Sequence, residues 1–279
     1  MNNWFGGNFN GEEAALCLEV RVDIAEQSGV GSVGFASIDA ATNNILIDWG
    51  DGSYPETIST HGTVTHAYSD STKRYLVKIY AANPSHTFGD GSYLSRDYDE
   101  NKITELVAMG DIKYNGGGSN DHGMFREARA VVGTPLKSSA DFRNVGSLRR
   151  KFNLATSFNG DVGSWDVSSV TNMTNMFSRA SAFNQDISAW SPSTSAANFV
   201  GMLSSTGMSV ENYSKWLIAL ANWSYDNNYS IAESLGATGC QYNNTTYTGI
   251  GSGQYTDAVS ARAYLTGTRG WTITDAGQV

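Results

Sequence analysis

Three side chains in the first third of the chain have the chemistry to hold a metal ion. Asp48 and Asp51 lie on either side of Trp49-Gly50, and His66 follows in a later predicted strand. A simpler interpretation is that both carboxylates accept hydrogen bonds from turn amides, while His66 bonds to the backbone beneath Trp49. We favour this second interpretation, so the sequence predicts no metal site and no cofactor here.

A second acidic group lies in a tyrosine-rich segment. Asp90, Asp97 and Asp99 could hold a divalent ion, but their spacing matches no known cation-binding loop. We interpret residues 88–93, with their Gly-Asp-Gly sequence, as a second hairpin turn. Neighbouring carboxylates such as Asp99 and Glu100 are usually just solvated.

No catalytic motif is present in the sequence. We find no nucleophile elbow, phosphate-binding loop, pair of histidine ligands or dinucleotide fingerprint, and the four histidines are isolated. A glycosidase, which needs two carboxylates facing each other across a cleft, stays the enzymatic alternative. The sequence therefore favours a protein that is not an enzyme.

Two segments near the C-terminus have a composition suited to binding. Residues 222–229 and 241–247 set tyrosine and tryptophan among asparagine, serine and threonine, which is typical of adaptable recognition loops. Such rings stack on sugars or anchor a protein partner. In the alternative, half of them pack in the core. The candidate binding residues are Trp223, Tyr225, Tyr229, Tyr242 and Tyr247.

Composition and charge limit the range of partners. Apolar residues make up 40% of the chain and charged residues 16%, which allows a real core. The net charge is −9, and basic residues are dispersed apart from Arg149-Arg150-Lys151. No basic stripe is available to neutralise phosphates, so nucleic acid and an anionic membrane surface are poor candidates.

The sequence predicts neither membrane insertion nor a secretory signal. It has no long apolar run, and its start lacks a cationic segment followed by an apolar one. We expect a chain that is cytosolic as made, that lost a signal, or that travels by another route such as virion assembly. Cys17 and Cys240 are interpreted as two buried thiols, with a disulfide between them as the alternative.

The first 84 residues have the pattern of a β-sandwich. Leu16, Leu18, Val20, Val22 and Ile24 alternate with other residues, as in a half-buried strand. Further strands are predicted at 45–49 and 75–80, and an Asp-Gly pair after the first of these favours a tight hairpin turn. Short strands with turn chemistry between them indicate a sandwich.

Three segments of this region carry a family resemblance. They are Asp48-Trp49-Gly50-Asp51-Gly52-Ser53, Val64-Thr65-His66-Ala67-Tyr68 and Tyr75-Leu76-Val77-Lys78-Ile79. In this order they resemble the PKD-type immunoglobulin-like domain. The resemblance implies a spacer or binding module of a surface protein.

An internal repeat fills the middle of the chain. Residues 158–165 and 183–190 share the pattern Phe-Asn-x-Asp-x-x-x-Trp at an offset of 25 residues, with weaker copies around Phe125 and Phe152. A fixed period of this size predicts a solenoid in which each repeat buries its apolar face against the next. Trp165, Met173 and Met176 are therefore predicted core residues, and we expect Asn172 to bond backbone groups at a corner.

The unit at 158–177 closely resembles the BspA-like leucine-rich repeat family, and weaker copies extend the resemblance over 105–205. The resemblance implies adhesion and recognition, because family members are surface proteins of bacteria and are carried by some phages. Residues 85–104 are predicted to connect this segment to the sandwich.

Residues 206–279 are predicted to cap the repeats. Apolar spacing indicates a helix over 210–220 with Ser209 as N-cap, and a shorter helix over 258–265 with Thr256 as its cap. Residues 271–274 alternate as a final strand. Solenoids need atypical terminal units to cover their last apolar layer.

The expected fold is thus mixed β and α/β, with a PKD/Ig-like β-sandwich, a short BspA-type solenoid and a helical C-terminal cap. The expected function is non-enzymatic recognition of a cell-surface glycan or protein by a phage virion appendage. The alternatives are a capsid decoration or cement subunit that contacts other virion proteins, and a bacterial surface adhesin without its signal peptide. A homo-oligomer is left open.

Overall fold

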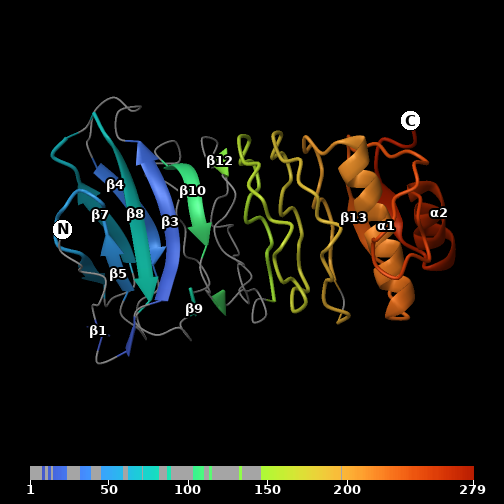
Figure 1. Ribbon diagram of the computed structural model, residues 1–279, viewed down its shortest axis with the longest axis horizontal. Helices are drawn as coiled ribbons and strands as arrows, with labels where there is room; N and C mark the ends of the chain where they lie inside the picture. The colour runs from blue at the N-terminus through green and yellow to red at the C-terminus, as the bar shows by residue number, and fades with distance from the viewer. Residues whose placement is uncertain are drawn as a thin grey trace.

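A computed structural model describes residues 45–58, 62–70, 72–81, 146–195 and 197–279, with strand segments 8–9, 12–13, 15–23, 32–38, 87–88, 103–109, 113–114 and 132–133. The molecule is elongated (Figure 1). Strands gather at the N-terminal end, stacked coils of chain follow, and the helices lie at the other end. The predicted mixture of strands with few helices is confirmed.

The largest sheet has six strands, and its neighbours are antiparallel except for the β10–β12 pair. In spatial order its strands are β12 (Val132–Gly133), β10 (Ile103–Met109), β3 (Ala15–Asp23), β8 (Arg74–Ala81), β5 (Ile45–Asp48) and β6 (Glu56–Ile58). The pairing of β10 with β3 joins the sequence that leads into the repeats to the N-terminal sheet.

Alternation of side chains explains this sheet. Val20 and Val22 in β3, like Ile45 and Ile47 in β5, are fully buried. Their neighbours along each strand point to the other face, because successive side chains of a strand alternate. The three strands predicted from this pattern are confirmed as β3, β5 and β8.

Smaller strand pairs complete the N-terminal region. The antiparallel pair β4 (Ser32–Ile38) and β7 (Gly62–Ala67) lies behind the large sheet in Figure 1. The other pairs are β1 (Asn8–Phe9) with β2 (Glu12–Glu13), and β9 (Thr87–Phe88) with β11 (Lys113–Tyr114). The predicted turn at 88–93, the acidic group of Asp90, Asp97 and Asp99, and the repeat around Phe125 lie outside the described residues.

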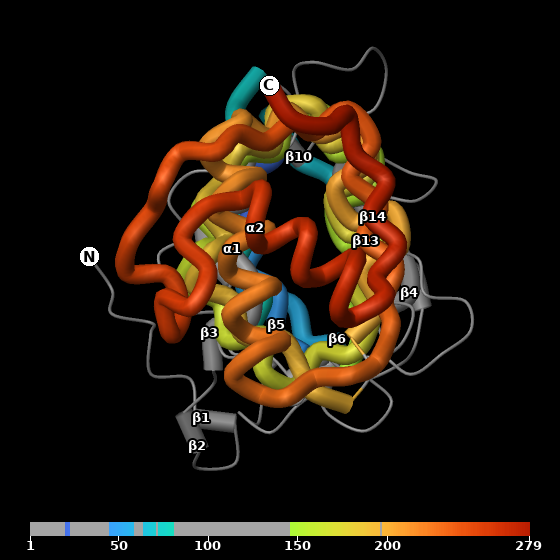
Figure 2. Tube along the Cα trace, turned by 90° about the vertical axis from the view of Figure 1, so that its right-hand side faces the viewer, coloured from blue at the N-terminus to red at the C-terminus, as the bar shows by residue number. Residues whose placement is uncertain are grey.

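The coils between residues 146 and 205 stack in parallel. The amide of Leu148 donates to the carbonyl of Asn172 at 2.8 Å, and the amide of Met173 donates to that of Asn198 at 2.8 Å. The view along the stack shows that successive coils overlie one another (Figure 2). The predicted offset of about 25 residues therefore corresponds to the register in which the backbones of neighbouring coils are hydrogen-bonded.

Aromatic rings fill the inside of the coils. Phe152 and Phe158 stack with centroids 4.0 Å apart, and Phe177 and Phe183 stack at 3.8 Å one coil later. Met173, Met176 and Trp165, the predicted core residues, are all buried. Each coil therefore buries its apolar side chains against its neighbours, because it is too short to enclose a core of its own.

Each coil has left-handed backbone at two positions four residues apart. At the first of these positions Arg150, Asn175 and Gly201 have φ angles of 57°, 54° and 65°. A Cβ atom on Gly201 would lie 2.1 Å from Oδ1 of Asn175, so a larger residue there would displace that side chain. Recurrence of such a costly conformation at one repeat position shows that the stacking outweighs the backbone strain.

Asparagines link consecutive coils along one edge. Oδ1 of Asn159 accepts a hydrogen bond from the amide of Asn184 at 2.7 Å, and Oδ1 of Asn184 accepts one from the amide of Ser209 at 2.8 Å. We call this series the asparagine ladder. The predicted role of Asn172 is also confirmed, because its Oδ1 accepts a hydrogen bond from the amide of Thr174.

Helix α1 (Val210–Asp226) begins where the ladder ends. Ser209 is its N-cap, as predicted, and accepts a hydrogen bond from the amide of Asn212. The predicted end at residue 220 is wrong, because the helix continues through the segment expected to be a recognition loop. Asn222 and Ser224 are buried on it, since their side chains bond to backbone carbonyls of other segments.

The last elements cover the end of the stack. Helix α2 (Ala258–Ala263) packs on α1 and runs into the π-helix η1 (Tyr264–Thr268). Its N-cap is Asp257 rather than the predicted Thr256, because the Asp257 carboxylate accepts from the amide of Ser260.

The predicted final strand is confirmed as β14 (Thr272–Thr274), which pairs in parallel with β13 (Ser234–Gly236). Cys240 is a buried free thiol beneath these strands, and it bonds to the carbonyl of Leu203. Of the two interpretations of the cysteines, the structure therefore supports a thiol over a disulfide at this position.

Candidate binding site at the C-terminal end

The predicted roles of Asp48 and Asp51 in the N-terminal turn are confirmed. Asp48 accepts a hydrogen bond from the amide of Gly50 and Asp51 accepts one from Ser53, each at 2.9 Å. The role of His66 is different, because its Nε2 lies 2.8 Å from the Asp51 carboxylate. Among the described residues no cluster of histidine, cysteine or acidic side chains could hold a metal ion.

The carbonyl of Trp49 is bonded by another residue than the one predicted. The hydroxyl of Tyr68 donates to it at 3.0 Å, while the ring of His66 stacks on the indole of Trp49 at 4.8 Å. The sequence Asp48–Ser53 also forms a longer connection than the tight turn expected, because β6 begins only at Glu56. This turn is closed upon itself.

The pKa of Asp51 reflects these hydrogen bonds within the turn. Partial burial alone would raise that pKa, but hydrogen bonds from Ser53 and His66 outweigh the burial and lower it to about 2. The carboxylate is therefore charged at any ordinary pH and committed to partners within the turn. The Asp51 carboxylate therefore stabilises the turn, and its hydrogen-bonding capacity is used by Ser53 and His66 and not by a ligand.

Two of the five predicted binding residues lie in the interior. Trp223 is 5% exposed and its indole Nε1 donates to the carbonyl of Pro192 at 3.0 Å. Tyr229 is 4% exposed, and its hydroxyl accepts from the amide of Ala197 and donates to Glu233. Burial raises the pKa of Glu233, and burial and this carboxylate also raise the pKa of Tyr229 well above its usual value.

Two further predicted residues are half-buried beneath cations. The guanidinium carbon of Arg262 lies 5.6 Å from the centroid of the Tyr242 ring, and the ammonium of Lys215 lies 5.7 Å from that of Tyr247. Arg262 is itself held by the buried Asp275 at 2.9 Å. These rings are thus already partly engaged by the protein's own side chains.

Tyr225 is the exposed member of the predicted set, with 48% of its surface accessible. It meets two tyrosines that the loop analysis missed. Its ring packs edge-on against Tyr255 at 6.3 Å and Tyr264 at 6.4 Å, and these two stack on each other at 4.6 Å. We call Tyr225, Tyr255 and Tyr264 the tyrosine cluster.

An arginine fixes the base of the tyrosine cluster. The guanidinium of Arg269 bonds to the hydroxyl of Tyr264 and lies 5.2 Å from that ring's centroid. It also contacts the carbonyl of Ser224 in the last turn of α1. Tyrosine with arginine is the composition of strong contact points in protein interfaces.

The loop that carries Tyr255 is fixed to α1 by one side chain. The amide of Asn222 donates at 2.9 Å to the carbonyls of Ile250 and Tyr255, and its oxygen accepts from the amide of Tyr255 at 2.8 Å. Asn222 is completely buried. The loop is therefore preorganised, which lowers the entropy cost of binding a ligand.

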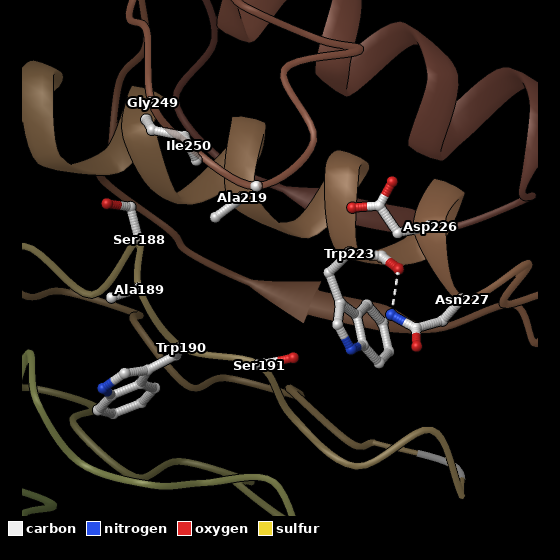
Figure 3. A pocket seen from close by; sticks show the side chains of 11 residues that line it. Ser188, Ala189, Trp190, Ser191, Ala219, Trp223, Asp226, Asn227, Gly249 and Ile250 are labelled. Carbon is white, nitrogen blue, oxygen red and sulfur yellow. Dashed lines mark hydrogen bonds between the residues drawn. The ribbon is translucent and has the colours of Figure 1, made fainter.

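A pocket of about 240 Å3 is lined in part by residues 249–251, which precede Tyr255 along the chain (Figure 3). Three segments supply its walls: a turn of the coils, the C-terminal half of α1, and the loop at 249–251. The lining residues are Ser188, Ala189, Trp190, Ser191, Ala219, Trp223, Asp226, Asn227, Gly249, Ile250 and Gly251. Its place between three separate segments explains why no local sequence pattern marks it.

Two polar side chains from the end of α1 lie at the rim of the pocket. The carboxylate of Asp226 has no bonding partner in the described part of the chain, and Asn227 uses its amide nitrogen to bond the carbonyl of Trp223 at 2.8 Å. The oxygen of Asn227 is thereby left for other groups. Figure 3 shows both side chains beside Trp223, with the segment of Ser188 to Ser191 on the other side of that ring.

No helix within the described ranges has the length and apolar character needed to cross a membrane.

The comparisons with known proteins reach part of the chain. Residues 120–235 match the family model described as "Mycoplasma protein of unknown function, DUF285". This segment includes both clear repeats and α1, so the predicted resemblance to a known repeat family is supported there. No match to the chain was found among curated proteins or among solved structures.

Proposed function

We propose that this chain is a non-enzymatic recognition protein that binds a glycan or protein at a cell surface through its C-terminal end. The observation that carries this proposal is the tyrosine cluster. Tyr225 is exposed on a fixed base of aromatic rings and arginine, next to a pocket. Exposed, rigid tyrosines give a large contact area at little cost in conformational entropy.

The rest of the fold supports presentation of this surface. We propose that the stacked coils are a BspA-type leucine-rich-repeat solenoid and that the N-terminal sheets are a PKD-like sandwich. The coils lie between those sheets and the C-terminal end (Figure 1), and the registered hydrogen bonds favour a stiff spacer. Such a protein would be displayed on a virion, or on a bacterial surface.

Binding of the labelled full chain to intact bacterial cells tests the proposal. We expect saturable binding that Tyr225→Ala weakens about tenfold, because truncation of an aromatic contact point typically costs this much or more. The stability of the variant should change by less than about 0.5 kcal/mol, since half of this side chain is already in water.

Tyr54→Ala is the matched control. Tyr54 is 82% exposed, and it belongs to the N-terminal region. Its removal should leave cell binding unchanged. If no tested cell binds the chain, or if both tyrosines matter equally, recognition through the C-terminal end is wrong, and a subunit that contacts only other virion proteins becomes the better hypothesis.

A further inference from the structure

We propose that the pocket beside α1 binds one neutral sugar unit of a glycan and rejects acidic sugars. This inference rests on the proposed function, for which it names the ligand class and the subsite. Four observations carry it: the size of the pocket, the tryptophan in its wall, the hydrogen-bonding groups at its rim and the sign of the local charge.

The volume limits the ligand to a small unit. Pockets for drug-sized ligands occupy roughly 300–1,000 Å3. The present pocket, at about 240 Å3, is smaller and has an exposed rim that includes Ser191, Asp226 and Gly249. A single ring at the end or side of a longer chain fits such a site better than an isolated large molecule.

Trp223 offers the pocket carbon surface rather than a hydrogen-bond donor. Its Nε1 is occupied by the carbonyl of Pro192, and a tilted contact with Tyr229 at 4.5 Å fixes its orientation. The negative face of an aromatic ring attracts the weakly positive C–H groups of a sugar ring. Trp223 lines the pocket but is only 5% exposed, so it offers a narrow strip of carbon surface that suits the C–H groups of a single sugar ring.

The polar groups favour a ligand that can donate hydrogen bonds. Asp226 contributes a carboxylate without a partner within the described residues, and Asn227 contributes its side-chain oxygen and one N–H beyond the one that bonds to Trp223. Ser191 adds an exposed hydroxyl that accepts or donates, whereas the side chain of Ser188 already bonds to Asp186. Adjacent hydroxyl groups of a sugar supply donors at this density, and hydrogen bonds to a carboxylate are the stronger kind.

The local charge opposes an acidic ligand. Asp226 is the one charged side chain among the residues that line the pocket. It ends α1, whose last turn has no basic residue, and the carbonyl end of a helix carries partial negative charge. A uronic or sialic acid would bring a second carboxylate toward this negative end, so discrimination should favour neutral sugars.

A glycan microarray with neutral and acidic oligosaccharides side by side tests the inference on the labelled full chain. We expect binding to at least one neutral glycan and none to its counterpart that carries a uronic or sialic acid. The best neutral glycan is then titrated against the variants by calorimetry. Asp226→Asn should raise Kd about tenfold, because it replaces a charged acceptor by a neutral one.

A second pair of variants separates occupation of the pocket from loss of charge. Ser191→Trp should fill the exposed rim and abolish glycan binding. Ser164→Trp places the same side chain in the corresponding turn one coil earlier, outside the pocket lining, and should leave Kd unchanged. Glu211→Gln removes a charge at the opposite end of α1 and should also have no effect on Kd.

The outcomes distinguish the two proposals. Cell binding without binding of any neutral glycan on the array, or with equal binding of acidic counterparts, overturns the sugar subsite and leaves recognition of a protein standing. Unchanged glycan affinity in Ser191→Trp also overturns the assignment to this pocket. If the unmodified chain binds no tested cell, the proposed function itself is wrong.

Discussion

The aromatic groups at the two ends of the molecule are built from similar residues but differ in the use of their polar atoms. In the N-terminal group, Trp49 stacks on His66, His66 meets Tyr68 edge-on, and Tyr68 stacks on Tyr75. Each also has a polar partner nearby: the Trp49 indole bonds to Glu56, and the other three bond to Asp51 or to backbone carbonyls. This group is closed.

The tyrosine cluster at the C-terminal end is open. Only the hydroxyl of Tyr264 is bonded, by Arg269, whereas those of Tyr225 and Tyr255 have no partner in the described ranges. Burial against its neighbours raises the pKa of Tyr255, so its hydroxyl stays protonated and able to donate. Stacked aromatic residues therefore do not indicate function by themselves. The unbonded hydroxyls and the exposed ring distinguish the group to which we assign binding in the proposed function.

Removal of Trp49 should give the largest effect on stability. Trp49 is 1% exposed and central to the closed group, so Trp49→Ala is expected to lower the free energy of unfolding by about 3–5 kcal/mol. Urea denaturation followed by circular dichroism measures this loss. A loss below about 1 kcal/mol would show that the closed group is not a structural centre, and the contrast between the two ends would fail.

Removal of a single hydroxyl sharpens the comparison. Tyr68→Phe leaves the buried carbonyl of Trp49 without its donor, so we expect a loss of about 1–3 kcal/mol in the free energy of unfolding. Tyr225→Phe is the matched control at the open end, where no bond is lost within the described residues. It should change stability by less than about 0.5 kcal/mol. Equal effects in the two variants would contradict the distinction.

Acid titration should give the smallest effect. The folded-state pKa of Asp51 is about 2, below its ordinary value of 3.8, so the stability that it contributes is complete above about pH 4. That stability is lost as the pH falls toward 2. Asp51→Asn should therefore flatten the decline of unfolding free energy over this interval, by under about 1 kcal/mol because an exposed pair is screened. If the unfolding free energy of the unmodified protein and of Asp51→Asn falls equally with pH over this interval, Asp51 does not stabilise the turn as expected.

Short-range patterns explain what the sequence predicted well. Alternation placed Val20, Val22 and Ile47 in the sheet core. Asp48 was identified as a turn residue because an aspartate side chain can accept a hydrogen bond from the amide two residues later, here that of Gly50. The repeat register came from matching aromatic positions, because stacked coils bring equivalent residues together. In each case the cause acts within one strand, one turn or one repeat.

Contacts between distant segments explain the misses. The continuation of α1 beyond residue 220 depends on Asn222, whose partners lie in the loop at 250–255. The exposure of Tyr225 but not Trp223 follows from the helical positions that result, and the pocket is defined by three segments far apart in sequence. Composition identified this part of the chain as rich in suitable residues, but it could not tell an inward-facing ring from an outward-facing one.

The asparagine ladder also sets how far the two ends lie from each other. Each rung joins one coil to the next until Ser209 occupies the corresponding position, where its own side chain caps α1 instead of bonding onward. An added 25-residue unit that keeps the asparagine would lengthen the molecule by one strand spacing, about 4.8 Å, and leave both ends intact. The length of the molecule can thus change in steps of one coil, and Ser209 occupies the ladder position at which the last coil ends and α1 begins.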